Sequence, residues 1–227
     1  WYLFIVGFAG SALPGFLFAI AQTEVSSSVA GVLNSLTPFF VLIQGVLFYE
    51  LILTKEKALG VILGLAGASV LIIFGNMGEG TVVEGNQWYA LFLVLATCSY
   101  ALSANTIQKH LQDISAINLS AAAYCIVAPL GLGYLFFTDF INTFNTHPDS
   151  MTSLGAVVVL SLASTVIASV IFFKLVQMTS ALFASMVAYF IPLVALLFGI
   201  YDGEKIMLYH FIGMAMILFG VYITKKK

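Results

Sequence analysis

The 227-residue chain contains no arginine, and only 8% of its residues are charged. About a quarter of the residues in soluble domains are charged, so this composition excludes an ordinary soluble globular protein. Apolar residues make up 61% of the chain and gather in long uninterrupted runs. A β-barrel would instead show alternating segments of about ten residues. The sequence therefore predicts an all-α, polytopic membrane protein.

Eight apolar runs of 16 or more residues are present, numbered one to eight in chain order. Each is near the roughly 20 residues that a helix needs to cross a bilayer, so we predict eight transmembrane helices. The runs are Tyr2 to Ile20, Ser26 to Tyr49, Leu59 to Phe74, Trp88 to Ile107, Ile117 to Phe137, Leu154 to Val176, Ser180 to Tyr201 and Met207 to Ile223.

Residues that carry enzyme chemistry are scarce as well. The three histidines and two cysteines show no metal-ligand spacing. The chain has no HExxH motif and no paired aspartates within the runs, which argues against a membrane-embedded enzyme. Cys98 and Cys125 lie inside apolar runs, which favours two buried hydrophobic residues over a disulfide or a metal pair. We expect no catalytic residue, no metal and no cofactor.

The few lysines predict how the chain crosses the membrane. Seven of the eight lie where the even-numbered runs end, and the positive-inside rule assigns that side to the cytoplasm. These seven are Lys55, Lys57, Lys109, Lys174, Lys225, Lys226 and Lys227. We therefore predict a multi-pass protein of the plasma (inner) membrane with both termini in the cytoplasm.

The segment from Ser26 to Glu50 recurs 154 residues later as Ser180 to Glu204. Identical pairs are Ser26 and Ser180, Ala30 and Ala184, Pro38 and Pro192, Leu42 and Leu196, Gly45 and Gly199, Glu50 and Glu204, and, after a one-residue deletion, Gly60 and Gly213, and Gly67 and Gly220. The two copies begin runs two and seven, so they cross the membrane in opposite directions. A step of five helices between inverted copies predicts a ten-helix fold of two five-helix repeats, of which the first two helices precede this sequence.

Pro38 and Pro192 lie about halfway along runs two and seven, where the ring removes a backbone hydrogen bond. Inside a membrane such a break faces protein or a water-filled cavity, which makes both segments candidates for substrate binding. The alternative is that nearby hydroxyls bond to their own helix and that the prolines only shape packing. The polar residues nearest the two breaks are Asn34, Ser35, Thr37, Ser185 and Tyr189.

Further candidate binding residues are the uncharged Tyr100, Asn105 and Tyr124 in runs four and five. Lys174 is the one charged residue within a run, and it either binds an anionic group or extends its stem to the interface. Without arginine, a polyanionic substrate would lack counter-charges in a low-dielectric site. A neutral, zwitterionic or amphipathic metabolite fits better.

Glycines at close spacing mark run three, where Gly60, Gly64 and Gly67 form a small-residue face. Such a face permits close helix contact in membranes. Run eight repeats it in part, and the sequence leaves open whether these faces meet within the chain or in a homodimer.

The pattern AxFASxxxYxIPxxAxxxGxxDGE at Ala181 to Glu204, followed by GMAMILFGVYITKKK, resembles the second repeat of the EamA family in the drug/metabolite transporter superfamily. The segment from Ser26 to Phe74 is similar to the end of its first repeat. The resemblance implies that residues 1–80 hold helices three to five and residues 81–227 hold helices six to ten, around a central cavity.

The resemblance also implies a secondary transporter that moves a small organic metabolite, such as an amino acid or drug-like compound, by alternating access. A non-transporting scaffold or assembly subunit and an exchanger of anionic metabolites remain alternatives. The expected partners are the substrate and the lipid bilayer, with no nucleic acid, and a homodimer with a second copy is left open.

Overall fold

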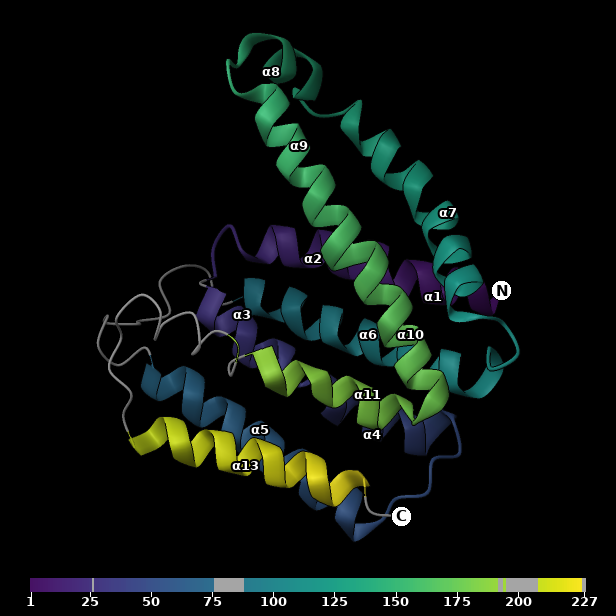
Figure 1. Ribbon diagram of the computed structural model, residues 1–227, viewed down its shortest axis with the longest axis vertical. Coiled ribbons are helices and arrows are strands. Elements are labelled where there is room, and N and C mark those ends of the chain that lie inside the picture. Colours follow the sequence, from purple (N-terminus) through teal and green to yellow (C-terminus); the bar gives the residue numbers. More distant parts are fainter. Residues whose placement is uncertain (26, 76–87, 192–193, 195–207, 226–227) are drawn as a thin grey trace.

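The computed structural model describes residues 1–25, 27–75, 88–191, 194 and 208–225. This part of the chain is helical throughout and contains no strand (Figure 1). Four of its helical paths are long and apolar enough to cross a membrane: Tyr2–Ala21, Tyr89–His110, Ala116–Leu135 and Ser150–Met178. The predicted all-α membrane class is confirmed, while the count of eight spans stays a prediction.

Most runs fold as single helices or as helices with a local change of pitch. The elements are α1 (Tyr2–Gly7), η1 (Phe8–Ala12), α2 (Leu13–Ala21), α3 (Ser27–Asn34), α4 (Thr37–Phe48), α5 (Lys55–Gly75), α6 (Tyr89–His110), α7 (Ala116–Leu135), α8 (Phe140–Thr146), α9 (Ser150–Leu160), η2 (Ser161–Ile167), α10 (Ala168–Met178), α11 (Ala181–Ser185), η3 (Met186–Phe190) and α13 (Leu208–Lys225). The short α8, between runs five and six, has no counterpart among the predicted helices.

Run two is divided into two helices rather than kinked within one. α3 ends at Asn34, and α4 begins at Thr37 with Pro38 in its first turn. At that position a proline costs no intrahelical hydrogen bond, because the first amides of a helix have no carbonyl partner. Pro192, the repeat-related proline, lies outside the described residues.

Two helices contain a π-helical segment of wider turns, η1 and η2. Adding the repeat offset of 154 to Phe8–Ala12 gives residues 162–166, which fall inside Ser161–Ile167. Such segments are rare and occur most often at functional sites. The first and sixth runs therefore share a departure from α-helical geometry at the same place.

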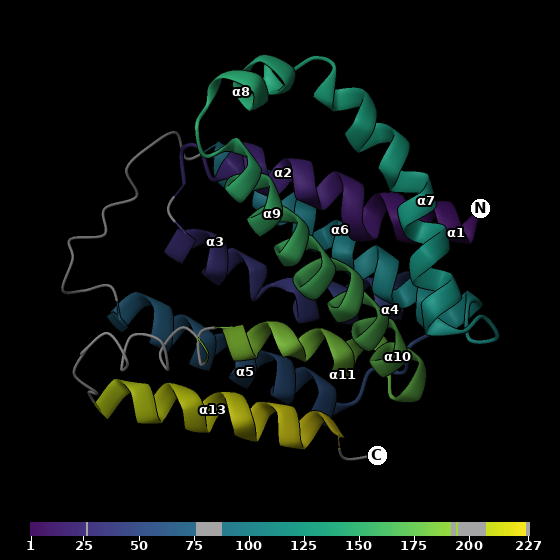
Figure 2. The ribbon, with the colours of Figure 1, turned by 45° about the horizontal axis from the view of Figure 1, so that its top comes forward.

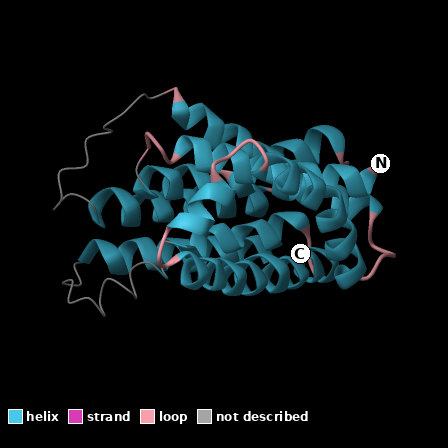
Figure 3. Cartoon of the chain, turned by 90° about the horizontal axis from the view of Figure 1, so that it is seen from above, coloured by secondary structure: helices cyan, strands magenta, loops and turns pink. Residues whose placement is uncertain are grey.

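α6 lies at the centre of the bundle and packs against α1, α2, α3, α4, α10 and α11 (Figures 1 and 2). Its buried face includes Ala101, Ala104 and Ile107, which join the main hydrophobic core. Seen from above, the helices form a flattened bundle (Figure 3). The hairpin formed by α7, α8 and α9 leaves this bundle and projects away from it (Figure 1).

α5 and α13 lie side by side and are the most extensively packed pair (Figures 1 and 2). A Cβ atom added at Gly60 would lie 2.6 Å from the carbonyl oxygen of Gly220, and one at Gly67 would lie 2.7 Å from that of Gly213. Only glycine permits backbones to approach this closely. The small-residue faces of runs three and eight therefore meet each other within the chain.

Candidate functional site

Polar groups from three helices meet near the middle of α6 and α7. The Tyr124 hydroxyl on α7 donates a hydrogen bond to the Thr165 carbonyl at 3.1 Å and also bonds to the Ser169 hydroxyl on α10. Tyr100 on α6 lies within electrostatic range of Tyr124, with no hydrogen bond between these two described side chains. These four residues, called the tyrosine cluster below, join two of the sequence-predicted site residues.

The π-helical segment η2 gives this cluster its backbone acceptor. The Thr165 carbonyl accepts from the amide of Ala168 as well as from Tyr124. On the other side, the ring of Phe18 on α2 lies 6.2 Å from that of Tyr100. The cluster thus combines hydroxyls, a carbonyl and aromatic rings, and it contains no charged side chain. Groups of this kind bind solutes through hydrogen bonds and ring contacts, and a binding role for the cluster stays a prediction.

The polar side chains at the break in run two form hydrogen bonds with backbone carbonyls three or four residues earlier in the same run. Thr37, which is buried, donates from its hydroxyl to the Asn34 carbonyl at 2.7 Å, and Ser35 donates to the Gly31 carbonyl at 3.0 Å. The Thr37 bond satisfies the Asn34 carbonyl, which Pro38 leaves without an amide partner, whereas the Gly31 carbonyl also accepts from the Ser35 amide. Asn34 itself is half-buried. The described geometry here matches the packing alternative, and a role in binding stays a prediction.

Asn105 bridges two helices in this conformation. Its side-chain amide is buried and donates to the Val41 carbonyl on α4 at 3.1 Å. Gln44, also on α4, donates to the Cys98 carbonyl at 2.9 Å and to the Cys98 sulfur at 3.0 Å. Such interhelical bonds are worth roughly 0.6 to 2 kcal/mol in membranes. α4 and α6 are therefore joined at two levels.

The two predicted site residues that the structure describes in run seven, Ser185 and Tyr189, are buried against neighbouring helices. Ser185 donates to the Leu182 carbonyl at 2.8 Å, within its own helix. Tyr189 is fully buried, and its hydroxyl donates to the Val61 carbonyl on α5 at 3.0 Å. Its ring covers Gly64, where an added Cβ would overlap it. In this structure Tyr189 links η3 to α5.

Replacing Tyr189 with phenylalanine keeps the ring and removes one buried hydrogen bond. We expect the variant to lose about 1 kcal/mol of stability, which a thermal melt of the purified protein in detergent measures. The exposed Tyr222 on α13 supplies the control, since Tyr222→Phe removes a hydroxyl from the surface. Equal melting temperatures for the two variants would contradict the role of this bond.

Lys174 is exposed on α10, four residues before the end of that helix at Met178. This position suits a side chain that extends to the membrane interface, the alternative that the sequence leaves open. The described structure does not bring it into the tyrosine cluster. Pro192 lies outside the described residues, and of the nine predicted binding residues that the structure describes, Tyr100 and Tyr124 alone belong to the cluster.

The helix ends near Lys109 are connected by several specific contacts. The Lys109 ammonium pairs with the Glu50 carboxylate at 2.7 Å, and the Tyr49 hydroxyl bonds to the Thr106 hydroxyl at 2.9 Å. The rings of Tyr2 and His110 stack with centroids 4.0 Å apart and planes 3° apart. Runs one, two and four are thereby held together at this end.

Two glutamines extend these contacts to runs five, six and seven. Gln177 donates to the carbonyls of Leu111 and Ile114 at 2.8 and 2.7 Å, and Gln108 accepts from the Ala181 amide at 2.6 Å. We call the helix ends joined by these bonds the Lys109 end. α9 has no buried residue, and the hairpin of α7, α8 and α9 projects from the side of the bundle (Figure 1). The Lys109 end is therefore the part of the bundle where specific polar contacts join the most helices.

The pair at the Lys109 end predicts a pH dependence. The Lys109 ammonium lowers the pKa of Glu50 below its usual value, through a hydrogen bond and charge attraction. A lowered folded-state pKa contributes stability above the unfolded-state pKa, and this stability is lost as pH falls through the folded-state pKa. The Glu50 side chain is 87% exposed, so the effect is small and is screened by salt.

The variant that tests this pair is Glu50→Gln, which removes the charge. Residue 50 has a φ of 58°, and glutamate and glutamine are equally strained at that angle, so the substitution leaves the backbone strain unchanged. We expect the difference in melting temperature between the two proteins to be largest at neutral pH and low salt. It should vanish in acid. A difference independent of both pH and salt would contradict the account of this pair.

The model of the EamA-like transporter family matches residues 1–73 and 87–225. The chain belongs to this family. The resemblance in run seven and run eight is thus confirmed, and with it membership of the drug/metabolite transporter superfamily. Together with the four membrane-length apolar helices, family membership identifies a multi-pass membrane protein.

Individual relatives agree with this assignment. An uncharacterized transporter of Archaeoglobus fulgidus is 26% identical over 199 residues, which cover 87% of this chain and 67% of that protein. Protein PagO of Salmonella typhimurium is 26% identical over 198 residues, covering 86% of this chain and 62% of PagO. The chain thus spans about two thirds of the length of these curated relatives.

A protein of known crystal structure has the same fold. Its TM-score to this chain is 0.72, over 99% of this chain and 75% of that protein, at 18% sequence identity. This similarity supports the fold and says nothing about the substrate.

Proposed function

We propose that the chain forms the larger part of a secondary transporter that carries a small neutral, zwitterionic or amphipathic organic molecule by alternating access. The observation that supports this most directly is membership of the EamA-like transporter family, together with four apolar helices of membrane length. Contacts of Tyr2, Lys109 and Gln177 close one end of the bundle. The tyrosine cluster lies near the middle of α6 and α7, the depth that a binding site in such a cycle needs.

The glycine contacts support the inverted repeat that this mechanism uses. Gly60 corresponds to Gly213 in the repeat, and Gly67 corresponds to Gly220. In space Gly60 meets Gly220, and Gly67 meets Gly213. In a two-fold contact, residue i of one copy meets residue j of the other, and residue j of the first copy meets residue i of the second. The paired π-helical segments η1 and η2 support the same two repeats, with helices three to five in residues 1–80 and six to ten in residues 81–227.

Lysine placement supports an orientation for this cycle. The Lys109 end is the side to which the positive-inside rule assigns the cytoplasm, with both termini there. We therefore propose that the described conformation is closed toward the cytoplasm of the plasma (inner) membrane. The segment between runs five and six, which contains α8, then faces outward.

The chemistry of the tyrosine cluster supports the substrate class. It offers hydroxyls, a carbonyl and rings, while Lys174 lies exposed elsewhere. Binding a polyanion without counter-charges would be costly in this environment. The glycine faces of α5 and α13 are already in contact, so a homodimer would use another surface.

A counterflow assay with the full-length protein in proteoliposomes tests the proposal. The vesicles are loaded with a panel of amino acids, amphipathic amines and other small metabolites, and uptake of the same labelled compound is followed. We expect accelerated exchange of at least one uncharged or zwitterionic compound over empty vesicles. Exchange of phosphorylated metabolites alone would favour the anion exchanger, and no exchange at all would favour the scaffold.

A further inference from the structure

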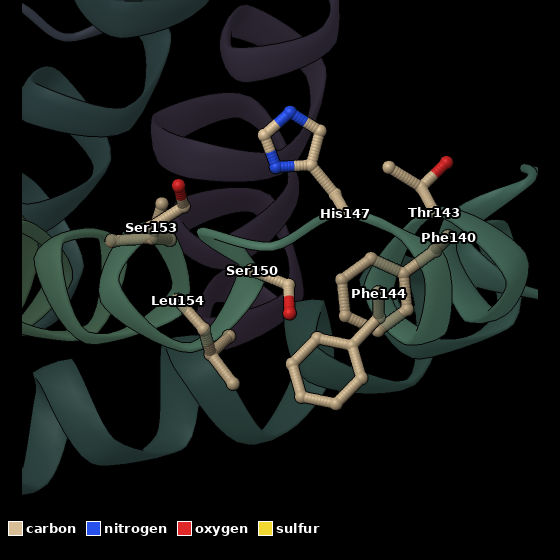
Figure 4. A pocket seen from close by; sticks show the side chains of 8 residues that line it. Phe140, Thr143, Phe144, His147, Ser150, Ser153 and Leu154 are labelled. Atoms are coloured by element: carbon tan, nitrogen blue, oxygen red, sulfur yellow. The ribbon is translucent and has the colours of Figure 1, made fainter.

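A pocket of about 370 Å³ lies between α8 and α9 in the projecting hairpin (Figure 4). Its apolar lining comes from Phe140, Phe144, Leu154 and Val157. The rings of Phe140 and Phe144 stack with centroids 6.0 Å apart, and together they form one aromatic side of the pocket. This volume falls within the range of roughly 300 to 1,000 Å³ typical of ligand sites.

The same pocket contains hydrogen-bond donors beside its apolar wall. Ser150, Ser153 and His147 line it, and in Figure 4 the Ser150 side chain lies between the phenylalanine rings and Leu154. The Nδ1 atom of His147 accepts from the Asp149 amide at 3.3 Å, so a neutral ring carries its proton on Nε2 and donates from there. The pocket therefore suits a ligand with acceptor oxygens at one end and an apolar body at the other.

Serines farther along the same helical path form side-chain hydrogen bonds with their own helix. Ser161 and Ser164 donate their hydroxyl protons to the carbonyls of Val157 and Leu160, four residues earlier. No such bond is present for the side chains of Ser150 and Ser153 among the described residues. These two hydroxyls keep their hydrogen-bonding capacity for a ligand.

The charge around the pocket is negative. Asp139 directly precedes Phe140, and Asp149 directly precedes Ser150. No lysine or arginine occurs between Lys109 and Lys174. A ligand with a net negative charge would be repelled, whereas one that adds a cation to its acceptor oxygens would be attracted.

The two aspartates also indicate at which depth of the bilayer the segment between them lies. Carboxylates are costly in hydrocarbon, so the short segment between Asp139 and Asp149 lies at the membrane interface. α7 and α9 lead into it with exposed apolar residues such as Phe136, Phe137 and Val159. The pocket therefore lies at the level of the lipid head groups, with an apolar helix surface running from it toward the hydrocarbon.

We propose that this pocket binds one zwitterionic phospholipid that has a primary-amine head group. Its phosphate oxygens accept hydrogen bonds from Ser150, Ser153 and His147, and its ammonium faces Asp149. The first methylenes pack against Phe140 and Phe144. The orientation proposed above assigns this lipid to the outer leaflet, but the binding does not depend on transport.

Native mass spectrometry of the full-length protein tests the site. The protein is exposed to an equimolar mixture of phosphatidylethanolamine and phosphatidylglycerol with the same acyl chains. We expect one phosphatidylethanolamine to be retained over phosphatidylglycerol by about fivefold, the factor that one ammonium–carboxylate attraction near solvent supplies. Equal retention of the two lipids would overturn the proposal.

Paired variants localise the binding. The double substitution S150A and S153A should lower phosphatidylethanolamine retention about tenfold, because two hydrogen bonds to phosphate are lost. The matched control, S161A with S164A, removes hydroxyls that bond to their own helix and should retain the lipid like the unaltered protein. Equal loss in both variants, or in neither, would overturn the proposal.

A third arm separates a lipid from a free anion. Inorganic phosphate added to the delipidated protein should leave its melting temperature unchanged, whereas phosphatidylethanolamine should raise it. Stabilisation by inorganic phosphate alone would identify the ligand as a free anion and would contradict a lipid site.

Discussion

Replacing Gly67 with leucine is expected to separate α5 from α13 and to cost at least about 3 kcal/mol, the upper part of the range for overpacked cores. A Cβ atom at this position would lie 2.7 Å from the Gly213 carbonyl and 2.9 Å from the Cβ of Met216. Backbone atoms cannot rotate away as a flexible side chain can, so the helices themselves must move apart. The melting temperature of the purified protein should fall on the order of 10 °C.

Gly155 on α9 provides the matched control. An added Cβ there meets nothing within 4 Å, and leucine has the higher helix propensity. Gly155→Leu should therefore melt within a few degrees of the unaltered protein or slightly above it. Similar losses at Gly67 and Gly155 would show that α5 and α13 do not meet as closely as described.

Removing the Tyr124 hydroxyl is expected to reduce transport by about tenfold, because a hydrogen bond in a site of low dielectric is lost. Tyr124→Phe keeps the ring between α7 and α10 but removes the bonds to Thr165 and Ser169. The initial rate of counterflow measures the effect once a substrate is known.

The control for this substitution is on the same helix. Tyr134 is exposed and lies near the end of α7, with its ring against Phe16. Tyr134→Phe should leave the counterflow rate unchanged, and both variants should elute as folded protein. Unchanged transport by Tyr124→Phe would remove the tyrosine cluster from the substrate path.

Long apolar runs were enough to predict the helical membrane class, because length and hydropathy alone decide whether a helix suits a bilayer. The small-residue faces of runs three and eight were also visible, since glycine spacing on a helix follows from its pitch. The sequence did not show that these two faces pair within the chain, because the same faces could equally form the contact between two copies in a dimer.

The break at Pro38 shows a second limit of the sequence. A proline in the middle of an apolar run suggests a kink, yet the chain ends one helix at Asn34 and starts another at Thr37. The choice depends on whether a side chain satisfies the freed Asn34 carbonyl, which the Thr37 hydroxyl does here. Tertiary neighbours decide this, and they are not visible in the sequence.

The candidate site was predicted in part for a similar reason. Tyr100 and Tyr124 could be identified as polar residues in apolar runs, and Ser169 belongs to the same pattern. The Thr165 carbonyl could not, because a main-chain acceptor leaves no mark in the pattern of side chains and the π-helical turn of η2 was not predicted. Tyr189 was predicted as a binding residue in the same way. In this conformation its hydroxyl instead forms a hydrogen bond with α5 and does not face a cavity.

Two distances measured by pulsed electron paramagnetic resonance test alternating access most directly. Spin labels at Trp1 and Gln112 report on the Lys109 end, and labels at Gln22 and Met151 report on the proposed outer side; all four positions are exposed. The protein is studied in proteoliposomes, in a background whose two native cysteines are replaced by serine, with and without the substrate found by counterflow. The account predicts reciprocal changes, with one distance lengthening as the other shortens. Distances that stay constant, or that lengthen together, would contradict it.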